Sequence, residues 1–209
     1  MSPAAQPPEH AAYNAANHDN DSAAVRAAMR RDRIAARLAL PPAEHARLSA
    51  LLEGHLELEF AGHAPGVVAF CWPIRGEFDA RPLVARLIAA GWCAAMPTVA
   101  AVDAPMVFRT WSPGAAMTDD PYGIPVPADA FPSVPPDVVL LPLVAFDDAG
   151  YRLGYGGGYF DRTLAAMAPA PVAVGVGFEL ARVAGIRPGA HDIPLDAVAT
   201  ETGIRRFHR

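Results

Sequence analysis

The residues best suited to chemistry lie together in one segment, 152–161, which reads RLGYGGGYFD. Four of the five residues from Gly154 to Gly158 are glycine. Glycine allows the backbone to approach an anion closely while successive N–H groups point toward it. Arg152 could add a positive charge whose fork geometry fits phosphate. Asp161 could hold a cation, because Mg²⁺ usually binds one or two carboxylates together with phosphate oxygens. The segment therefore predicts a phosphate-binding site.

The alternative for this segment is a mobile glycine-rich turn that binds nothing. The glycines match neither of two common phosphate motifs. No lysine follows them as in G-x-x-x-x-G-K-[ST], and Tyr159 takes the place of the last glycine in G-x-G-x-x-G. An arginine before the glycines and an aspartate after them favour an anion site over a bare turn.

The elements around the glycines would position them. The apolar run 138–141 predicts a strand, residues 147–150 have the composition of a turn, and residues 159–167 predict a helix. A helix that begins where the glycine loop ends contributes the partial positive charge of its first N–H groups. This order of elements supports the interpretation of the loop as a phosphate site.

A second candidate site lies earlier in the chain, after the first predicted strand, 66–72. A loop over 73–79 follows this strand, then a helix to about residue 90 and a strand over 92–96. Strand, helix and strand in this order indicate a βαβ unit, and hence a parallel sheet with a right-handed crossover. Ligands of such sheets bind at the carboxyl ends of the strands. The loop over 73–79 is therefore a candidate to contact a ligand.

Two helices precede that unit. Ser22 could cap a first helix that runs to about residue 40, where two prolines end it, and a second helix covers 43–61. We expect the first helix to have an approximate apolar stripe and, for most of its arginines, a solvated basic face. The stripe comprises Val25, Met29, Ile34 and Leu38, and the arginines are Arg26, Arg30, Arg31, Arg33 and Arg37.

The whole pattern of elements indicates an α/β fold. Further short strands are predicted over 106–109, 171–178, 197–200 and 203–207. We predict a single three-layer open domain, Rossmann-like, with a mainly parallel sheet, over residues 22–209. Residues 1–21 are rich in Pro, Ala and Asn without apolar periodicity, and we expect a disordered tail there.

Composition excludes several classes of protein. The net charge of −5 gives no electrostatic support to a nucleic-acid partner. Cys71 and Cys93 lie far apart without a C-x-x-C motif, which fits two ordinary thiols in a reducing compartment. No apolar run approaches the length of a membrane span. We expect a soluble cytoplasmic protein. All 17 basic residues are arginine, so an arginine in place of lysine is weak evidence of changed function in this chain.

The segment 152–161 resembles the signature of the 5-formyltetrahydrofolate cyclo-ligase family, also called 5,10-methenyltetrahydrofolate synthetases. The common form of that signature is R-L-G-x-G-x-G-Y-Y-D, and only Phe160 differs, a change that keeps the aromatic ring. A weaker resemblance extends from about residue 26 to about residue 201.

The resemblance implies further site residues. Relatives carry K-x-x-L-R near their start, which here is matched from Arg26 to Arg30, and its basic residues meet nucleotide phosphates. A segment similar to Y-x-P-x-x-x-E places Trp72 and Glu77 against the folate, although core packing is an equal alternative for Trp72. A segment similar to H-D-x-x-x-D pairs Asp192 with the aspartate after the glycines as metal ligands.

The resemblance also implies a reaction. The family converts 5-formyltetrahydrofolate to 5,10-methenyltetrahydrofolate with ATP and Mg²⁺ and releases ADP and phosphate, through a phosphorylated formyl group, an iminium phosphate. It implies catalytic roles for Arg152, Tyr155 and Tyr159 and metal binding by Asp161 and Asp192. The implied ATP and phosphate contacts are Arg26, Arg30, Arg152, Leu153, Gly154, Tyr155, Gly156, Gly157, Gly158, Tyr159 and Phe160. We expect small-molecule partners only, and a monomer or small homo-oligomer.

Two other functions stay open. Val126 stands where relatives often have a glutamate, Ala181 where they often have a glutamine, and Arg26 where they have a lysine. These departures favour a relative that binds nucleotide or folate without this catalysis. The third possibility is an isomerase or transferase of phosphorylated sugars on a similar α/β fold, which would be indifferent to Mg²⁺ and would need a general base near the loop.

Overall fold

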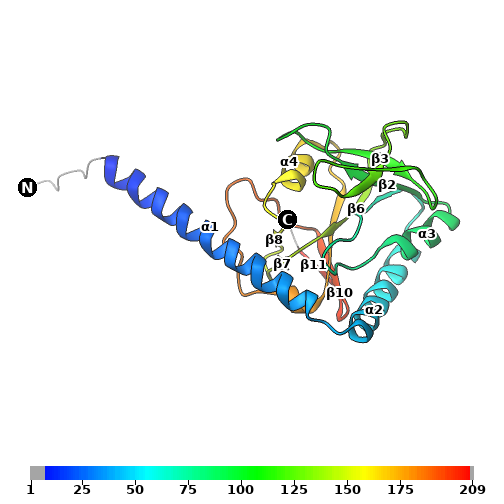
Figure 1. Cartoon of the computed structure of the whole chain (residues 1–209), viewed down its shortest axis with the longest axis horizontal. Coiled ribbons are helices and arrows are strands. Elements are labelled where there is room, and N and C mark those ends of the chain that lie inside the picture. Colours follow the sequence, from blue (N-terminus) through cyan, green and yellow to red (C-terminus); the bar gives the residue numbers. More distant parts are fainter. Residues whose placement is uncertain (1–7, 208–209) are drawn as a thin grey trace, which may run out of the picture.

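The computed structural model describes residues 8–207, and it describes side chains from Ser22 onward. Helix α1 (Pro8–Leu38) leads into the body of the molecule and therefore begins before Ser22 (Figure 1). Residues 8–21 belong to this helix, so the predicted disordered tail and the predicted cap at Ser22 are wrong there. For residues 1–7, which lie outside the described residues, the tail stays a prediction.

The body is built on a seven-stranded sheet with the order β11-β10-β9-β6-β1-β2-β3. The five inner strands are parallel, and the two edge strands are antiparallel to their neighbours. The strands are β1 (Val67–Ala69), β2 (Cys93–Thr98), β3 (Val107–Trp111), β6 (Val138–Pro142), β9 (Val172–Val176), β10 (Ala197–Thr200) and β11 (Gly203–Arg206). The prediction of a mainly parallel sheet is confirmed.

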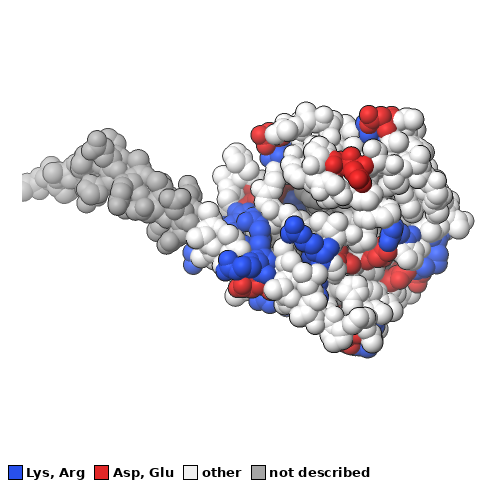
Figure 2. All heavy atoms as spheres, viewed as in Figure 1, with Lys and Arg blue, Asp and Glu red and all other residues white. Residues whose placement is uncertain are grey.

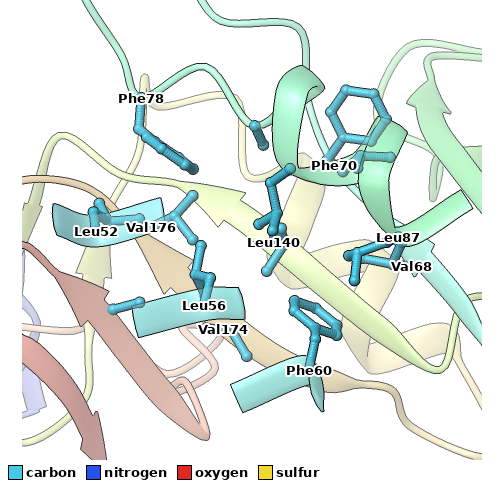
Figure 3. Close-up of a cluster of buried hydrophobic side chains, with 14 of the residues drawn as sticks. Leu52, Leu56, Phe60, Val68, Phe70, Phe78, Leu87, Leu140, Val174 and Val176 are labelled. Atoms are coloured by element: carbon cyan, nitrogen blue, oxygen red, sulfur yellow. The ribbon is translucent and has the colours of Figure 1, made fainter. Parts of the chain in front are cut away.

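Buried residues on both faces of the sheet explain why the inner strands are continuous apolar runs. Helices α2 (Pro42–Ala61) and α3 (Arg81–Ala89) cover one face, and α4 (Tyr159–Ala166) packs on the other (Figure 1). Leu140 of β6 lies in the cluster under α2 and α3, whereas Leu141 lies in the cluster under α4. Leu56 of α2 points toward the sheet in Figure 3. The predicted three-layer α/β architecture is therefore confirmed.

Helix α1 packs on the body mainly through arginines, and of the predicted apolar stripe Met29 packs against a core cluster, that of Ala145, Leu153 and Ile186. Leu38 is 59% exposed, whereas Arg37 is only 6% exposed. The guanidinium of Arg33 donates to the carbonyl oxygen of Leu180 at 2.9 Å. The prediction of a solvated basic face is thus wrong for Arg33 and Arg37, because carbonyl groups of the body accept their hydrogen bonds. It holds for Arg31, whose side chain is 73% exposed.

Short elements outside the main sheet complete the fold. One of them is a hairpin of β4 (Met117–Asp119) and β5 (Pro125–Pro127). A second hairpin, β7 (Ala145–Phe146) and β8 (Arg152–Leu153), separates β6 from the glycines. The strand directly before the glycines is therefore β8 and not the strand predicted over 138–141. The 3-10 turn η1 (Glu179–Ala181) follows β9.

The turn predicted over 147–150 is confirmed, and Asp147 explains it. One oxygen of its carboxylate accepts the N–H groups of Ala149 and Tyr151, at 3.1 and 3.0 Å, and Gly150 takes a φ of 85°. This turn fixes where β8, and hence the glycine loop, begins. Of the helices in the described part of the chain, none combines the length and the apolar character that crossing a membrane requires.

Candidate active site

A cavity of about 700 Å³ opens at the carboxyl ends of β1, β2 and β6. The strands β1, β2 and β3 extend the sheet in one direction from this point, and β6, β9, β10 and β11 extend it in the other. The boundary between β1 and β6 is therefore the topological switch point, where open α/β sheets bind ligands. Both loops that the sequence singles out, 73–79 and 154–158, contribute to the walls.

The glycine loop forms one end of the cavity. Gly156 has a φ of 104° and Gly158 a φ of 64°, conformations that residues with a side chain rarely adopt. A Cβ at Gly157 would lie 2.9 Å from the ring of Tyr159, so glycine is needed there for space. Arg162 of α4 donates to the carbonyl oxygen of Gly157 at 2.7 Å and holds the loop against its helix. These features thus hold the loop in a conformation that presents its backbone to the cavity.

Two arginines of α1, Arg26 and Arg30, reach this end of the cavity, where the resemblance implies them. Arg30 Nε donates to the carbonyl oxygen of Gly154 at 2.8 Å, and Arg26 forms an ion pair with Asp192 at 2.9 Å. Burial, together with the neighbouring charge of Arg26, lowers the pKa of the Arg30 guanidinium. Arg30 still carries its charge at neutral pH, because arginine does not lose its proton in proteins. Figure 2 shows basic side chains gathered where α1 meets the body.

Arg152 lies beneath the loop and is 7% exposed. Its Nη2 donates to Oδ1 of Asp161 at 2.9 Å, and its Nη1 donates to the carbonyl oxygen of Ile193 at 2.8 Å. The N–H of Ile193 donates to the same Oδ1 at 3.1 Å. Arg152 borders the cavity, but these contacts also fix the carboxylate of Asp161.

The two aspartates predicted to bind metal, Asp161 and Asp192, both line the cavity. Within the described part of the chain, no group of three or more acidic, histidine or cysteine side chains could hold a metal ion. The carboxylate pair nevertheless fits Mg²⁺, which often takes one or two carboxylates and completes its shell with phosphate oxygens and water. The residues present here therefore fit Mg²⁺ only when a phosphate group is bound beside it.

A buried carboxylate occupies the other end of the cavity. Tyr155 donates its hydroxyl to Oε1 of Glu77 at 2.6 Å, and the N–H of Ile74 donates to Oε2 at 3.0 Å. Arg37 Nη2 donates to the hydroxyl oxygen of Tyr155 at 2.8 Å. Burial raises the pKa of Glu77, although these hydrogen bonds and the charges of Arg37 and Arg75 act in the opposite direction. Burial and the charge of Glu77 likewise raise the pKa of Tyr155.

Flat and apolar side chains surround this carboxylate. Trp72 packs against the core under α2 and α3, as one of its two predicted roles requires. It also lines the cavity, and its contact with folate stays a prediction. The guanidinium of Arg81 lies 4.1 Å from the centre of its ring. Apolar residues of several strands and loops complete the wall: Ile74, Met96, Pro97, Val99, Met106, Ile124 and Val126. Such a surface suits a planar heterocycle whose polar edge meets a carboxylate.

Two tyrosines meet at the mouth of the cavity. The hydroxyl groups of Tyr122 and Tyr159 lie 2.8 Å apart, and their rings meet edge to face with centres 6.0 Å apart. This hydrogen bond raises the pKa of Tyr159. The hairpin of β4 and β5 is thereby linked to the first residue of α4.

The structure brings together nearly all the residues that the sequence singles out. Leu153 is the exception, because its side chain is fully buried beside Ala145 and Ile186 and does not line the cavity. Of the positions that depart from the family pattern, Val126 lines the cavity and Ala181 lies in the core. The residues that do line the cavity are Arg26, Arg30, Trp72, Glu77, Arg152, Gly154, Tyr155, Gly156, Gly157, Gly158, Tyr159, Phe160, Asp161 and Asp192.

Sequence reasoning missed several residues of the site, among them Tyr122, which lines the cavity, and Arg37, which contacts Tyr155 from behind its wall. The spacing of Arg26, Arg30, Arg33 and Arg37 along α1 contains a signal that could have found Arg37. Steps of four, three and four residues place all four guanidinium groups on one face of a helix. Nothing near Tyr122 in the sequence indicates its contact with Tyr159.

Comparison with known proteins gives a consistent result. Residues 22–201 match the 5-formyltetrahydrofolate cyclo-ligase family. The 5-formyltetrahydrofolate cyclo-ligase of Escherichia coli (strain K12) is 33% identical over 135 residues, which are 62% of this chain and 74% of the relative. The enzyme of the same name from Haemophilus influenzae is 34% identical over 95 residues, which are 43% of this chain and 51% of the relative.

Solved structures agree on the fold. The 5,10-methenyltetrahydrofolate synthetase of Aquifex aeolicus superposes with a TM-score of 0.74 at 29% identity, over 88% of this chain and 94% of that one. The synthetase of Mycoplasma pneumoniae has a TM-score of 0.68 at 21% identity, over 84% of this chain and 98% of that one, and supports the fold alone.

Proposed function

The chain belongs to the 5-formyltetrahydrofolate cyclo-ligase family and is an enzyme of that kind, and from this premise we propose how its cavity carries out the reaction. It converts 5-formyltetrahydrofolate to 5,10-methenyltetrahydrofolate in an ATP- and Mg²⁺-dependent reaction that releases ADP and phosphate. One observation carries this proposal: a single cavity joins a glycine loop flanked by arginines to a buried carboxylate with flat, apolar surroundings.

The chemistry needs activation of a poor electrophile. The oxygen of the N5-formyl group attacks the γ-phosphorus of ATP, ADP leaves, and an iminium phosphate forms. The folate N10 then attacks the formyl carbon, its proton is released, and phosphate leaves with the former formyl oxygen to give the methenyl bridge. Little acid–base chemistry is required of the protein, so positioning and charge neutralisation carry the catalysis.

The end of the cavity that is formed by the glycine loop, which we call the phosphate end, binds the triphosphate. Backbone N–H groups of the glycine loop, with Arg26 and Arg30, surround an anion whose charge grows on the transferred group. Tyr155 and Tyr159 flank that group from either end of the loop. We assign Arg152 to this end as well, where it also fixes the carboxylate of Asp161.

Asp161 and Asp192 are the residues that would hold Mg²⁺. When bound beside ATP, this ion supplies positive charge that neutralises the phosphate oxygens. Without any ligand, Arg26 neutralises Asp192 and Arg152 neutralises Asp161. These ion pairs therefore hold both carboxylates in a fixed orientation toward the cavity.

The end of the cavity around Glu77, which we call the folate end, positions the pterin. Glu77 offers carboxylate oxygens to the N–H donors of the ring, and Trp72 provides a flat wall beside it. Each oxygen of Glu77 already accepts one hydrogen bond from the protein, which fixes its direction and leaves lone pairs for a ligand. We further propose that the enzyme acts in the cytoplasm on small molecules only.

Absorbance of methenyltetrahydrofolate tests the proposal. Wild-type protein should form product from 5-formyltetrahydrofolate only with both ATP and Mg²⁺, and Asp161→Ala should form almost none. Asp129→Ala, at a surface aspartate whose side chain is 87% exposed, is the matched control and should behave as wild type. A folded wild type that binds ATP and folate but makes no product would overturn the proposal and favour the non-catalytic relative.

A further inference from the structure

We propose that Arg37 is a positioning residue that fixes the Glu77 carboxylate and the Tyr155 hydroxyl as one unit at the folate end of the cavity. The inference rests on the proposed function, because Glu77 is assigned there to the folate. It also links the two ends of the site, since Tyr155 belongs to the glycine loop and Glu77 to the loop after β1.

The guanidinium of Arg37 contacts three separate segments of the chain. Its Nε donates to the carbonyl oxygen of Arg75 at 2.9 Å, and its Nη1 donates to the carbonyl oxygen of Leu143 at 3.0 Å. Its Nη2 donates to the hydroxyl oxygen of Tyr155 at 2.8 Å and lies 3.7 Å from Oε1 of Glu77. A planar group held along three directions has no freedom to rotate.

This arrangement determines the direction of the tyrosine proton. Arg37 donates a hydrogen bond to the hydroxyl oxygen of Tyr155, so the hydroxyl proton must point away from Arg37. Oε1 of Glu77 accepts that proton in a hydrogen bond of 2.6 Å. The side chains of Arg37 and Glu77 are only 6% and 5% exposed. Water therefore has little access to replace these hydrogen bonds, and the carboxylate depends on them for its orientation.

The charged and titratable groups around Glu77 come from two other elements and from its own loop. Arg37 faces it from α1, Tyr155 faces it from the glycine loop, and Arg75 and Cys71 lie on the loop after β1. Burial raises the pKa of Glu77, and the charge of Arg37 opposes that rise. Loss of the Arg37 charge should therefore raise the pKa of Glu77 further and disfavour its ionised form.

A purely structural role for Arg37, as an anchor of α1, is the alternative. Arg33 offers the matched control, because it lies one helical turn earlier and anchors α1 to the carbonyl oxygen of Leu180 without touching Glu77 or Tyr155. An anchoring role predicts that Arg33→Gln and Arg37→Gln both lower thermal stability and leave folate recognition unchanged. A positioning role predicts that they differ in folate recognition.

The experiment uses Arg37→Gln, Arg37→Lys, Tyr155→Phe and Arg33→Gln in the full chain. Thermal unfolding checks that each is folded, fluorescence titration gives the Kd for 5-formyltetrahydrofolate, and steady-state assays give the KM for each substrate between about pH 5 and 9. We expect Arg37→Gln to raise the Kd and KM for folate about tenfold to a hundredfold. The KM for ATP should change by less than about threefold.

The pH profile separates charge from geometry. In Arg37→Gln the acid limb of kcat/KM for folate should move to higher pH, because the pKa of Glu77 rises. Arg37→Lys keeps a positive charge but not the three directions of the guanidinium, so its acid limb should stay near that of wild type while its KM rises. Tyr155→Phe, which removes only the hydroxyl, should raise the KM in the same direction and serves if Arg37→Gln does not fold.

Three results would overturn the inference. These are wild-type folate Kd in a folded Arg37→Gln, equal effects in Arg33→Gln and Arg37→Gln, or an unchanged Kd in Tyr155→Phe. If wild type binds folate but forms no product, the proposed function fails while the binding titrations still decide the role of Arg37. If wild type does not bind folate, both fail.

Discussion

At the phosphate end of the cavity, the ion pair of Arg26 and Asp192 is partly open to solvent, with side chains 21% and 18% exposed. At the folate end, Arg37 and Glu77 are almost completely buried, and a tyrosine stands between them. Partly exposed pairs cost little to separate, whereas buried charges depend on every partner that they have. The phosphate end is thus suited to exchange its partners when a charged ligand arrives, and the folate end is suited to keep a fixed direction.

After the near-complete loss expected for Asp161→Ala, the largest effect should come from Gly156→Ala at the phosphate end. A φ of 104° disfavours any residue with a Cβ, and that Cβ would lie 3.5 Å from the guanidinium of Arg30. We expect kcat/KM for ATP to fall about a hundredfold, since such strain costs about 1–3 kcal/mol and the loop also loses its contact geometry. Gly154→Ala is the matched comparison, because it has free space and no positive φ, and its loss should be clearly smaller. Steady-state kinetics measures both, and an equal rise in the KM for folate would contradict the separation of the two ends.

Glu77→Gln should have the next largest effect, confined to the folate end. Removing a charged acceptor from a buried hydrogen-bonded site should lower kcat/KM for folate about thirtyfold. Burial raises the pKa of Glu77, so wild type should lose folate affinity as the pH falls, at a pH above the range of an ordinary carboxyl group. The variant has no such group to titrate and should lack this acid limb. A pH profile with the same acid limb in both proteins would show that Glu77 does not meet the substrate.

Arg26→Gln should have a smaller effect, which depends on salt. We expect the KM for ATP to rise about tenfold at low ionic strength and the difference from wild type to shrink at about 1 M salt, because exposed charges are screened. For Arg26→Lys, the KM for ATP should stay within about threefold of wild type, because lysine keeps the charge. Only the bidentate geometry is lost. If the effect of Arg26→Gln is independent of salt, the phosphate end does not work through exposed charge.

Tyr122→Phe should have the smallest effect. It removes one hydrogen bond, 2.8 Å long, between two tyrosines at the mouth of the cavity. We expect kcat/KM for either substrate to fall about twofold to threefold, as for a solvent-accessible hydrogen bond. A loss beyond about tenfold, more than one such bond supplies, would mean that the hairpin of β4 and β5 does more than border the site.

The sequence predicts the phosphate end better than the folate end, and the reason is physical. Glycine loops, the adjacent aspartate and the arginine pair at a spacing of four are local patterns, so Gly156, Asp161 and Arg30 can be found without a fold. Arg37 cannot, because its partners come from three segments that only the sheet brings together. The apolar pattern of helix α1 is also misleading, since Leu38 lies in solvent and an arginine takes its expected place against the body.

The strands of the main sheet are predictable because inner parallel strands are buried on both faces and therefore form continuous apolar runs. The short hairpins are not, because β7 and β8 have two residues each and their positions follow from the Asp147 turn rather than from periodicity. For the same reason, apolar periodicity identifies β6 but not β8 as the strand that leads to the glycines.

Helix α1 contacts both ends of the cavity, through Arg26 and Arg30 at one and Arg37 at the other. A rise of 1.5 Å per residue puts about 16 Å along the axis between the first and last of these arginines. The chain can therefore accept substitutions on the outer side of this helix, but not a change in the number of residues between Arg26 and Arg37. One inserted or deleted residue between Arg30 and Arg37 would turn the two groups about 100° out of phase. The distance between the two ends of the cavity thus depends on the number of residues between these arginines.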